Sequence, residues 1–168
     1  MNKKQKGFSL IELLIVVAII LIIAAIAIPN LLRARIAANE ASAVGSVRSI
    51  VTAEVTYAST WGTGFATAIG NLGGAVLPCT ASAATACLID PVLTAGSKSG
   101  YTIAAPGGAA VNGIVQTFAV SAVPITVGQT GQRAFCSDES GVVRFDPTGA
   151  LTAATDTACE GAGFTTLQ

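Results

Sequence analysis

Apolar residues are distributed unevenly along this chain, and their pattern changes twice between the N-terminus and the C-terminus. The twenty residues from Leu13 to Leu32 carry no charge, and a helix that spans a bilayer needs about that many apolar residues. From Asn30 the apolar positions recur at helical spacing among charged ones, which predicts an amphipathic continuation of the same helix. We therefore expect one helix from about residue 8 to about residue 58, roughly 75 Å long.

The amphipathic half of this helix should pack through one or two apolar faces. Alanines between the charged residues favour helix throughout this stretch. Pro29 lacks a backbone donor, so we expect a kink or a loosening of the helix over residues 25–29. The sequence Trp61-Gly62-Thr63-Gly64 should end the helix. The apolar positions assigned to the packing faces are Leu32, Ile36, Val44, Val47, Val51 and Val55.

The second half of the chain has short apolar runs separated by turn residues. A connector rich in Gly, Ala and Thr covers residues 61 to about 99, with a short helix expected near residues 83–93. Short successive strands joined by tight turns predict an antiparallel meander, whose apolar face would pack on the amphipathic half of the helix. The fold class is therefore α+β. Four strands are expected: Tyr101–Ala105, Val115–Val123, Gln132–Ser137 and Val142–Phe145.

Glu12 lies at the start of the apolar run and is an acidic residue among apolar ones. A carboxylate in a membrane segment costs about 2.5–3.5 kcal/mol, so its charge should be compensated or used. Three basic residues, Lys3, Lys4 and Lys6, precede the run. By the positive-inside rule they place the N-terminus in the cytoplasm and the rest of the chain outside it.

The residues Lys3-Lys4-Gln5-Lys6-Gly7 and Phe8-Ser9-Leu10-Ile11-Glu12, followed by an apolar run broken by a proline, resemble the N-terminus of bacterial type IV pilins and type II secretion pseudopilins. The resemblance is close over about the first thirty residues and extends to the remainder only in layout. It implies that a prepilin peptidase cuts between Gly7 and Phe8, and that the new amine of Phe8 is N-methylated. It also implies that Glu12 neutralises the N-terminal amine of a neighbouring subunit during assembly.

The same resemblance implies the organisation of the chain and its partners. Residues 1–7 would be a leader, residues 8–30 a transmembrane and filament-core helix, and residues 31–168 a globular head in the pilin fold. The subunit would span the inner membrane once, with its N-terminus in the cytoplasm, and then enter an extracellular helical filament of identical subunits. The pilus or type II secretion assembly machinery would be a further partner. Without the leader the side chains sum to −3, and no basic patch indicates nucleic-acid binding.

Four cysteines allow three disulfide connectivities, and the sequence alone does not choose among them. We favour the local pairing, Cys79 with Cys87 and Cys136 with Cys159. Disulfides are stable outside the cytoplasm, and each would contribute about 2–4 kcal/mol. The second pair resembles the disulfide-bounded C-terminal loop of type IV pilins. Free buried thiols are the alternative; a zinc site is less favoured, since the chain has no histidine and no Cys-x-x-Cys spacing.

The composition offers little for catalysis. Without histidine there is no Ser-His-Asp or Cys-His arrangement, so we expect neither an enzyme nor a cofactor. The acidic residues Asp138, Glu139 and Asp146 could form a calcium site, but acidic turns are usually solvated, and we expect no metal. An aromatic path for electron conduction is another alternative, and ordinary packing is the simpler interpretation. The rings concerned are Tyr57, Trp61 and Tyr101.

The function that the resemblance implies is a structural subunit of a type IV pilus-like filament, supporting adhesion, motility or DNA uptake. A pseudopilin of a type II secretion system is the first alternative; the length of 161 residues after cleavage and the paired cysteines favour a pilin. A membrane-anchored extracytoplasmic binding or enzyme domain is an alternative of another class, and it would need a pocket with titratable side chains. A plain signal anchor, or a secretory signal cut after Ala25 or Ala27, would make Glu12 incidental.

Overall fold

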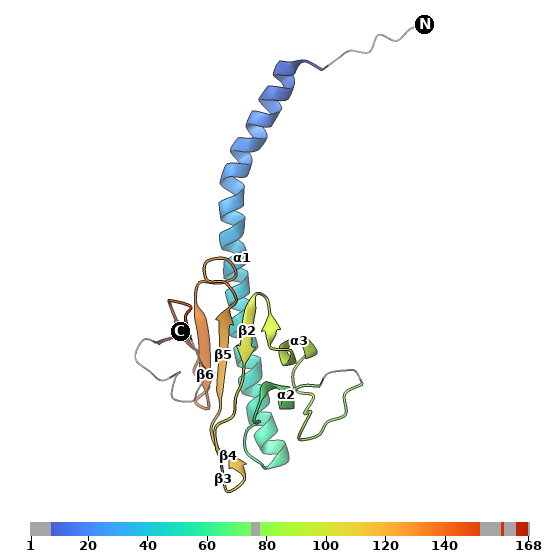
Figure 1. The fold of residues 1–168 in the computed structure, drawn as a ribbon, viewed down its shortest axis with the longest axis vertical. Helices are drawn as coiled ribbons and strands as arrows, with labels where there is room; N and C mark the ends of the chain where they lie inside the picture. The colour runs from blue at the N-terminus through green and yellow to red at the C-terminus, as the bar shows by residue number, and fades with distance from the viewer. Residues whose placement is uncertain (1–7, 75–77, 152–158, 160–163, 168) are drawn as a thin grey trace. The chain divides into compact units, whose positions relative to one another are not determined.

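The computed structural model describes residues 8–74, 78–151, 159 and 164–167. The chain divides between Arg35 and Ile36 into two compact units. One helix, α1 (Leu10–Trp61), contributes to both units, and the strands belong to the second (Figure 1). A long apolar helix followed by an antiparallel sheet confirms the predicted α+β class.

In the first unit, α1 exposes nearly every described side chain. Leu32, which we expected on the packing face, is 47% exposed. The helix runs without interruption through Pro29, although this residue cannot donate a backbone hydrogen bond. The loosening expected over residues 25–29 therefore does not break the helix.

In the second unit, the buried face of α1 differs in part from the predicted one. Val47 is fully buried as expected, and Ile36, Val44 and Val51 are half-buried, but Val55 is 56% exposed. The contact positions fall at helical spacing and include alanines, whose small side chains let the sheet approach closely. With these positions against the sheet, Val55 lies on the side of the helix that faces solvent. The buried positions are Glu40, Ala43, Ser46, Val47, Ile50, Ala53, Glu54 and Tyr57.

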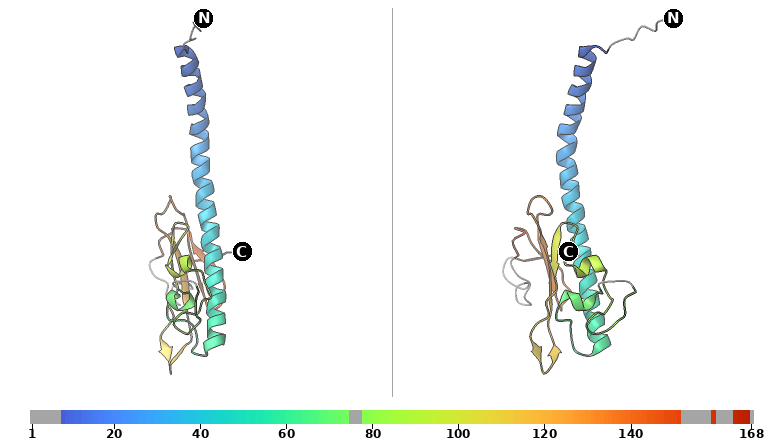
Figure 2. Two further views of the ribbon diagram at one scale, coloured as in Figure 1. Left: turned by 90° about the vertical axis from the view of Figure 1, so that its right-hand side faces the viewer. Right: turned by 45° about the vertical axis from the view of Figure 1, so that its right-hand side comes forward.

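The sheet of the second unit is an antiparallel meander with the strand order β1-β2-β5-β6-β7-β8. Figure 2 shows it as one layer beside the second half of α1. A separate hairpin pairs β3 (Ala110–Val111) with β4 (Ile114–Val115). The strands of the main sheet are β1 (Ser97–Lys98), β2 (Tyr101–Ala104), β5 (Ala119–Pro124), β6 (Ala134–Asp138), β7 (Arg144–Asp146) and β8 (Thr165–Thr166).

The predicted strands correspond to β2, β5, β6 and β7, and the two-residue strands β1 and β8 extend the sheet at its edges. The prediction of one strand over Val115–Val123 is wrong, because Val115 belongs to β4 and β5 begins at Ala119. The hairpin that causes this break turns at Asn112 and Gly113. Their φ angles of 54° and 81° suit an Asn-Gly two-residue turn, a signal that the sequence analysis overlooked.

The prediction of a short helix near residues 83–93 is also wrong. Two single-turn helices form instead, α2 (Ile69–Leu72) and α3 (Pro91–Thr94). The Asp90 side chain caps α3 by accepting a hydrogen bond from the Leu93 N–H at 2.9 Å, and Pro91 occupies the first helical position. Asp-Pro is therefore a helix start rather than a helix end at this point.

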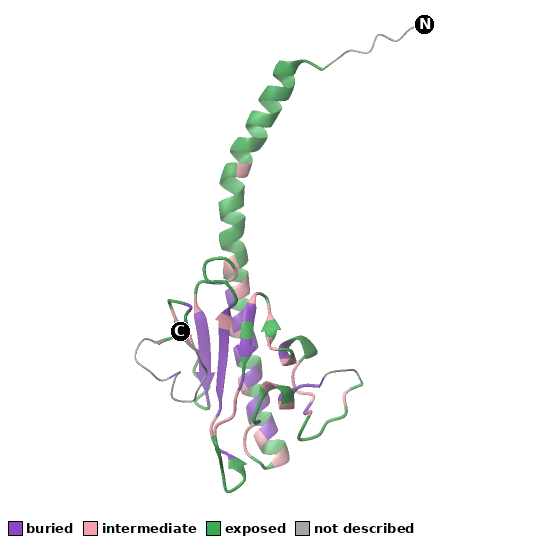
Figure 3. Cartoon of the chain, in the orientation of Figure 1, coloured by how far each residue is buried: buried purple, intermediate pink, exposed green. Residues whose placement is uncertain are grey.

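The core lies between α1 and the inner face of the sheet (Figure 3). In β2 the burial alternates, with Tyr101 and Ile103 inside. In β5 and β6 nearly every residue is buried, and in β6 Cys136 is bonded to Cys159 and Asp138 is paired with Arg144. The largest apolar core side chains are Val47, Ile50, Leu72, Leu93, Tyr101, Phe118, Val120 and Phe135.

Candidate functional site

The residues singled out at the start of α1 form a local helix cap. Phe8 is 81% exposed, and Ser9 directly precedes the helix. The Ser9 N–H donates to Glu12 Oε2 at 3.0 Å, and the Leu13 N–H donates to the Ser9 carbonyl at 3.3 Å. The first bond is one half of a capping box, and it places the carboxylate at the positive end of the helix dipole. Glu12 thus satisfies a backbone donor of its own helix.

Gly7 lies outside the described residues, so the Gly7–Phe8 cleavage stays a prediction. The methylation of Phe8 and the pairing of Glu12 with a neighbouring amine also stay predictions. In the described part of the chain, Phe8 is exposed and Glu12 accepts one hydrogen bond, from the Ser9 N–H.

The apolar segment that follows exposes large side chains around the whole circumference of α1, from Leu10 to Leu32. It makes α1 long and apolar enough to cross a membrane, by length and composition. A helix that is apolar all round is stable only when lipid or other protein covers it. This segment therefore needs either a bilayer or neighbouring helices.

Glu40 fastens α1 to the loop between β5 and β6. Its Oε1 accepts hydrogen bonds from the backbone N–H groups of Gln132 (2.9 Å) and Arg133 (3.1 Å). Its Oε2 accepts from Arg133 Nε (3.0 Å) and Nη2 (2.7 Å). The guanidinium lies 5.5 Å from the ring centre of Phe135 and 5.1 Å from that of Phe145. Burial raises the pKa of Glu40, but these bonds outweigh it and hold the pKa below its usual range.

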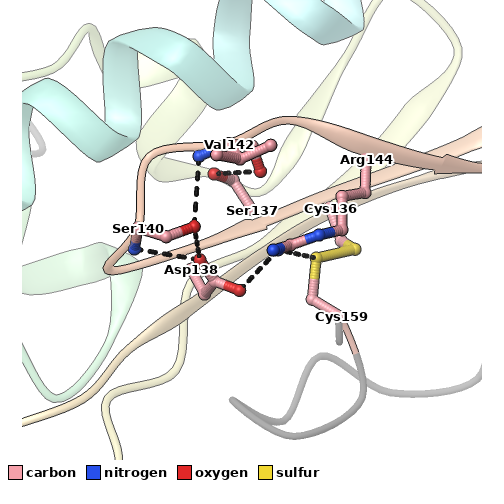
Figure 4. A network of polar contacts seen from close by, with 7 residues as sticks. All are labelled: Cys136, Ser137, Asp138, Ser140, Val142, Arg144 and Cys159. Carbon is pink, nitrogen blue, oxygen red and sulfur yellow. Dashed lines mark hydrogen bonds and ion pairs between the residues drawn. A yellow bond between two sulfur atoms is a disulfide. The ribbon is translucent and has the colours of Figure 1, made fainter. Parts of the chain in front are cut away.

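Asp138, a candidate calcium ligand, is occupied by protein groups (Figure 4). Its Oδ2 lies 2.7 Å from Arg144 Nη1, and its Oδ1 accepts hydrogen bonds from the Ser140 N–H at 2.9 Å and from the Ser140 hydroxyl. Burial raises the pKa of Asp138, and the Ser140 and Arg144 contacts outweigh it, so the pKa is lowered. Asp146 accepts from the Thr148 N–H at 2.8 Å. Among the described residues no cluster of three or more potential metal ligands occurs.

Both disulfides join cysteines that are close in the sequence, which is the pairing we favoured. Cys79 bonds to Cys87 and Cys136 to Cys159, with Cα atoms 6.0 and 5.8 Å apart. The second disulfide fixes Cys159 to β6, and Arg144 Nη1 lies 4.0 Å from Cys159 Sγ (Figure 4). It therefore ties a C-terminal residue to the centre of the sheet.

Replacing Cys136 and Cys159 with serine is expected to lower the free energy of unfolding by about 3 kcal/mol, because the bond closes a long loop in the unfolded chain. The Cys79/Cys87 double serine variant is the comparator. Its loop is shorter, with a separation of 8 residues against 23, so its loss should be nearer 2.5 kcal/mol. Urea unfolding followed by circular dichroism measures both. A larger loss for the Cys79/Cys87 variant would contradict the loop-entropy account.

The aromatic candidates belong to separate pairs. The rings of Tyr57 and Trp61 have centroids 4.9 Å apart, and Tyr101 lies 6.1 Å from Phe135. The hydroxyl of Tyr57 donates to the Ala83 carbonyl at 2.7 Å. Each ring thus has a packing partner or a hydrogen-bond partner within the second unit.

Glu54 is the residue that sequence reasoning missed. In the sequence it is one of several charged residues in the predicted helix, but its side chain is completely buried. Its Oε2 accepts a hydrogen bond from the Ala66 N–H at 2.8 Å. Burial raises the pKa of Glu54 to about 7, although this N–H acts in the opposite direction. Its spacing of seven residues from the buried Val47 was the available signal, since two helical turns separate residues on one face.

Comparison with known proteins gives matches that each cover only part of the chain. Residues 2–28 match the family model described as the prokaryotic N-terminal methylation motif. Over 58 residues the chain is 43% identical to the type IV major pilin protein PilA of Myxococcus xanthus. This aligned stretch covers 34% of this chain and 26% of that protein. Over 38 residues the chain is 66% identical to the type IV wide pilus major component PilA4 of Thermus thermophilus, covering 23% and 29%.

These matches leave most of each protein uncompared. The chain spans between a quarter and a third of the length of the curated relatives that it matches. No solved structure shows a significant match. The comparisons therefore cover about a third of the chain at most, and the remainder has to be interpreted from its own residues.

Proposed function

We propose that this chain, whose N-terminal segment carries the prepilin methylation motif, is the structural subunit of a type IV pilus-like filament. The observation that carries this proposal is the combination of that motif with an apolar helix exposed on all sides from Leu10 to Leu32. The apolar side chains of such a helix would be buried first in the bilayer and, after assembly, against the helices of identical subunits. The similarity to pilins of two bacteria supports the same assignment.

Glu12 has a role at each stage of the proposed route. In the membrane-anchored precursor its hydrogen bond to the Ser9 N–H, 3.0 Å long, partly offsets the unfavourable transfer of a carboxylate into the apolar segment. After a prepilin peptidase cuts between Gly7 and Phe8, the methylated amine of a neighbouring Phe8 supplies a positive charge. A buried pair satisfied on both sides is tolerated, whereas one unpaired buried charge is strongly destabilising. Glu12 therefore selects the register in which subunits join.

The remainder of the chain serves as the head in this proposal. Residues 8–30 form the filament core, and residues 31–168, with the second half of α1, form the head that faces the medium. Lys3, Lys4 and Lys6 keep the N-terminus in the cytoplasm until the leader is removed. The partners are identical subunits, the prepilin peptidase, the assembly machinery and, before assembly, the inner membrane.

Mass analysis of material sheared from cells, beside the envelope fraction, tests this function. We expect the sheared chain to begin at N-methylated Phe8 and to be four hydrogens lighter than the reduced form, because both disulfides are closed. The same processed chain confined to the envelope would instead indicate a pseudopilin. A chain that begins at Met1, or after Ala25 or Ala27, would overturn the proposal.

A further inference from the structure

The side chain of Glu54 is buried without the partners that a buried carboxylate normally has. None of its surface is exposed, and only Oε2 has a hydrogen-bond donor, the Ala66 N–H at 2.8 Å. Oε1 has no partner within the described part of the chain. A buried carboxylate that is ionised and held by one backbone donor is strongly unfavourable, whereas the neutral acid tolerates such a site far better.

The segment that Glu54 contacts is held to the rest of the second unit mainly through β4 and its neighbours. The Phe65 N–H donates to the Val115 carbonyl at 2.9 Å, and the Val115 N–H donates to the Thr63 carbonyl at 3.0 Å. Gly64 has a φ of 79°, and a Cβ there would lie 2.0 Å from the Val115 carbonyl oxygen, so the two backbones touch. Glu54 supplies the hydrogen bond that ties this segment, residues 63–67, to α1.

No ion pair among the described residues includes Glu54. On α1, Glu40 is paired with Arg133, and the Tyr57 hydroxyl donates to the Ala83 carbonyl. From the sheet, the Tyr101 hydroxyl donates to the Arg133 carbonyl. Segment 63–67 and the β3–β4 hairpin contain no titratable residue. Asp138 and Arg144 pair with each other.

We propose that Glu54 is a protonation-controlled latch between α1 and segment 63–67. When its carboxyl group is neutral, the segment stays docked on the helix through the Ala66 N–H. When the carboxyl group loses its proton, the latch opens and the charge reaches water. This proposal concerns the second unit alone and stands independently of the proposed filament function.

The direction of the pH dependence follows from the raised pKa of Glu54, which is about 7 in the closed state against an ordinary value of 4.5. The closed state binds the proton more tightly than the open state. Closure is therefore fully favoured below pH 4.5, weakens as the pH rises, and reaches its minimum once the pH has passed about 7. Between pH 6 and pH 8 the opening constant should rise about tenfold.

Hydrogen exchange at the Ala66 amide tests the latch in the full chain, solubilised in detergent micelles and corrected for the intrinsic pH dependence of exchange. We expect its protection to fall about tenfold between pH 6 and pH 8 and to stay well below that of the β5 amides, which exchange through global unfolding. The Glu54→Gln variant, which retains an acceptor for the Ala66 N–H, should show no such dependence. Glu139→Gln, at an exposed carboxyl, is the matched control and should behave as the wild type.

Three results would overturn the latch. Protection at Ala66 that does not change with pH is the first, and the same pH dependence in Glu54→Gln is the second. Protection at Ala66 as high as that of the β5 amides at every pH is the third, because it would mean that Ala66 exchanges through global unfolding rather than local opening. If Glu54→Gln fails to fold, carbon-13 titration of the wild-type Glu54 carboxyl decides the matter. A midpoint near 7 supports the latch, and one near the ordinary value of 4.5 overturns it.

Discussion

Glu12→Gln is expected to lower the yield of surface filaments by about 100-fold or more, while the chain is still processed and inserted in the membrane. Glutamine keeps an oxygen that accepts from the Ser9 N–H, so the helix cap survives and only the charge is lost. In the proposed filament the Phe8 amine would then be buried without a counter-charge. An uncompensated buried charge costs about 3–5 kcal/mol, and each 1.4 kcal/mol is a factor of ten. Quantitative immunoblotting of sheared material measures the yield.

Two comparisons make this result specific to the charge at position 12. Glu139→Gln removes an exposed carboxylate from the β6–β7 turn and should leave the yield unchanged. The membrane fraction should contain processed Glu12→Gln chains in normal amount. Normal filament yield from Glu12→Gln would show that this carboxylate has no part in assembly, and would leave only its capping role.

Glu40→Ala should lower the free energy of unfolding of the second unit by about 3 kcal/mol. The change leaves the backbone N–H groups of Gln132 and Arg133, and the Arg133 guanidinium, without their acceptor. Removing one member of a buried pair typically costs about 3–5 kcal/mol, and the lower end applies because the Arg133 side chain is 39% exposed to water. Urea unfolding of the full chain in micelles measures this loss.

The control for Glu40→Ala is Asp90→Ala, which removes an exposed ion pair with Lys98 and the cap of α3. Its expected loss is about 1 kcal/mol. Equal losses for the two variants would contradict the importance assigned to the Glu40 contacts.

The Glu40 contribution should also depend on pH, with a sign opposite to that of Glu54. Because the folded state lowers the pKa of Glu40, its stabilisation is complete above the ordinary value of 4.5 and is lost as the pH falls through the lower folded value. Stability should therefore decline towards acid through Glu40 and towards neutral pH through Glu54. Unfolding of wild type and Glu40→Ala at a series of pH values separates the two effects.

Features that depend on residues close together in the sequence were predictable. The long charge-free run predicts a helix because its length and composition leave few alternatives, and α1 begins and ends within three residues of the expected bounds. The strands near Tyr101, Phe135 and Phe145 follow from apolar runs bounded by glycine-containing turns. The observed disulfide pairing is the local one that we favoured, although four cysteines by themselves allow three connectivities.

Features that depend on distant residues could not be read in the same way. Helical spacing alone cannot tell which of two overlapping faces meets a sheet, so Val55 was assigned to the core while Ala43 and Ala53 occupy it. Glu40 and Glu54 are ordinary helix charges in the sequence. In the folded second unit Glu40 binds Arg133, and Glu54 is buried against the Ala66 N–H. Neither contact can be seen from the residues next to these glutamates in the sequence.

The meander order has a consequence for how the head is built. Apart from the β3–β4 hairpin, each strand of the main sheet pairs with its neighbour along the chain, so the sheet grows by local steps with little loop-closure entropy. The contact between Glu40 and Arg133 instead joins residues 93 positions apart. In a chain that crosses the membrane with its N-terminus held back, this half of α1 emerges early and Arg133 much later. We therefore expect the apolar face of the helix to stay uncovered until the strands have formed, and docking of the helix to be a late step of folding.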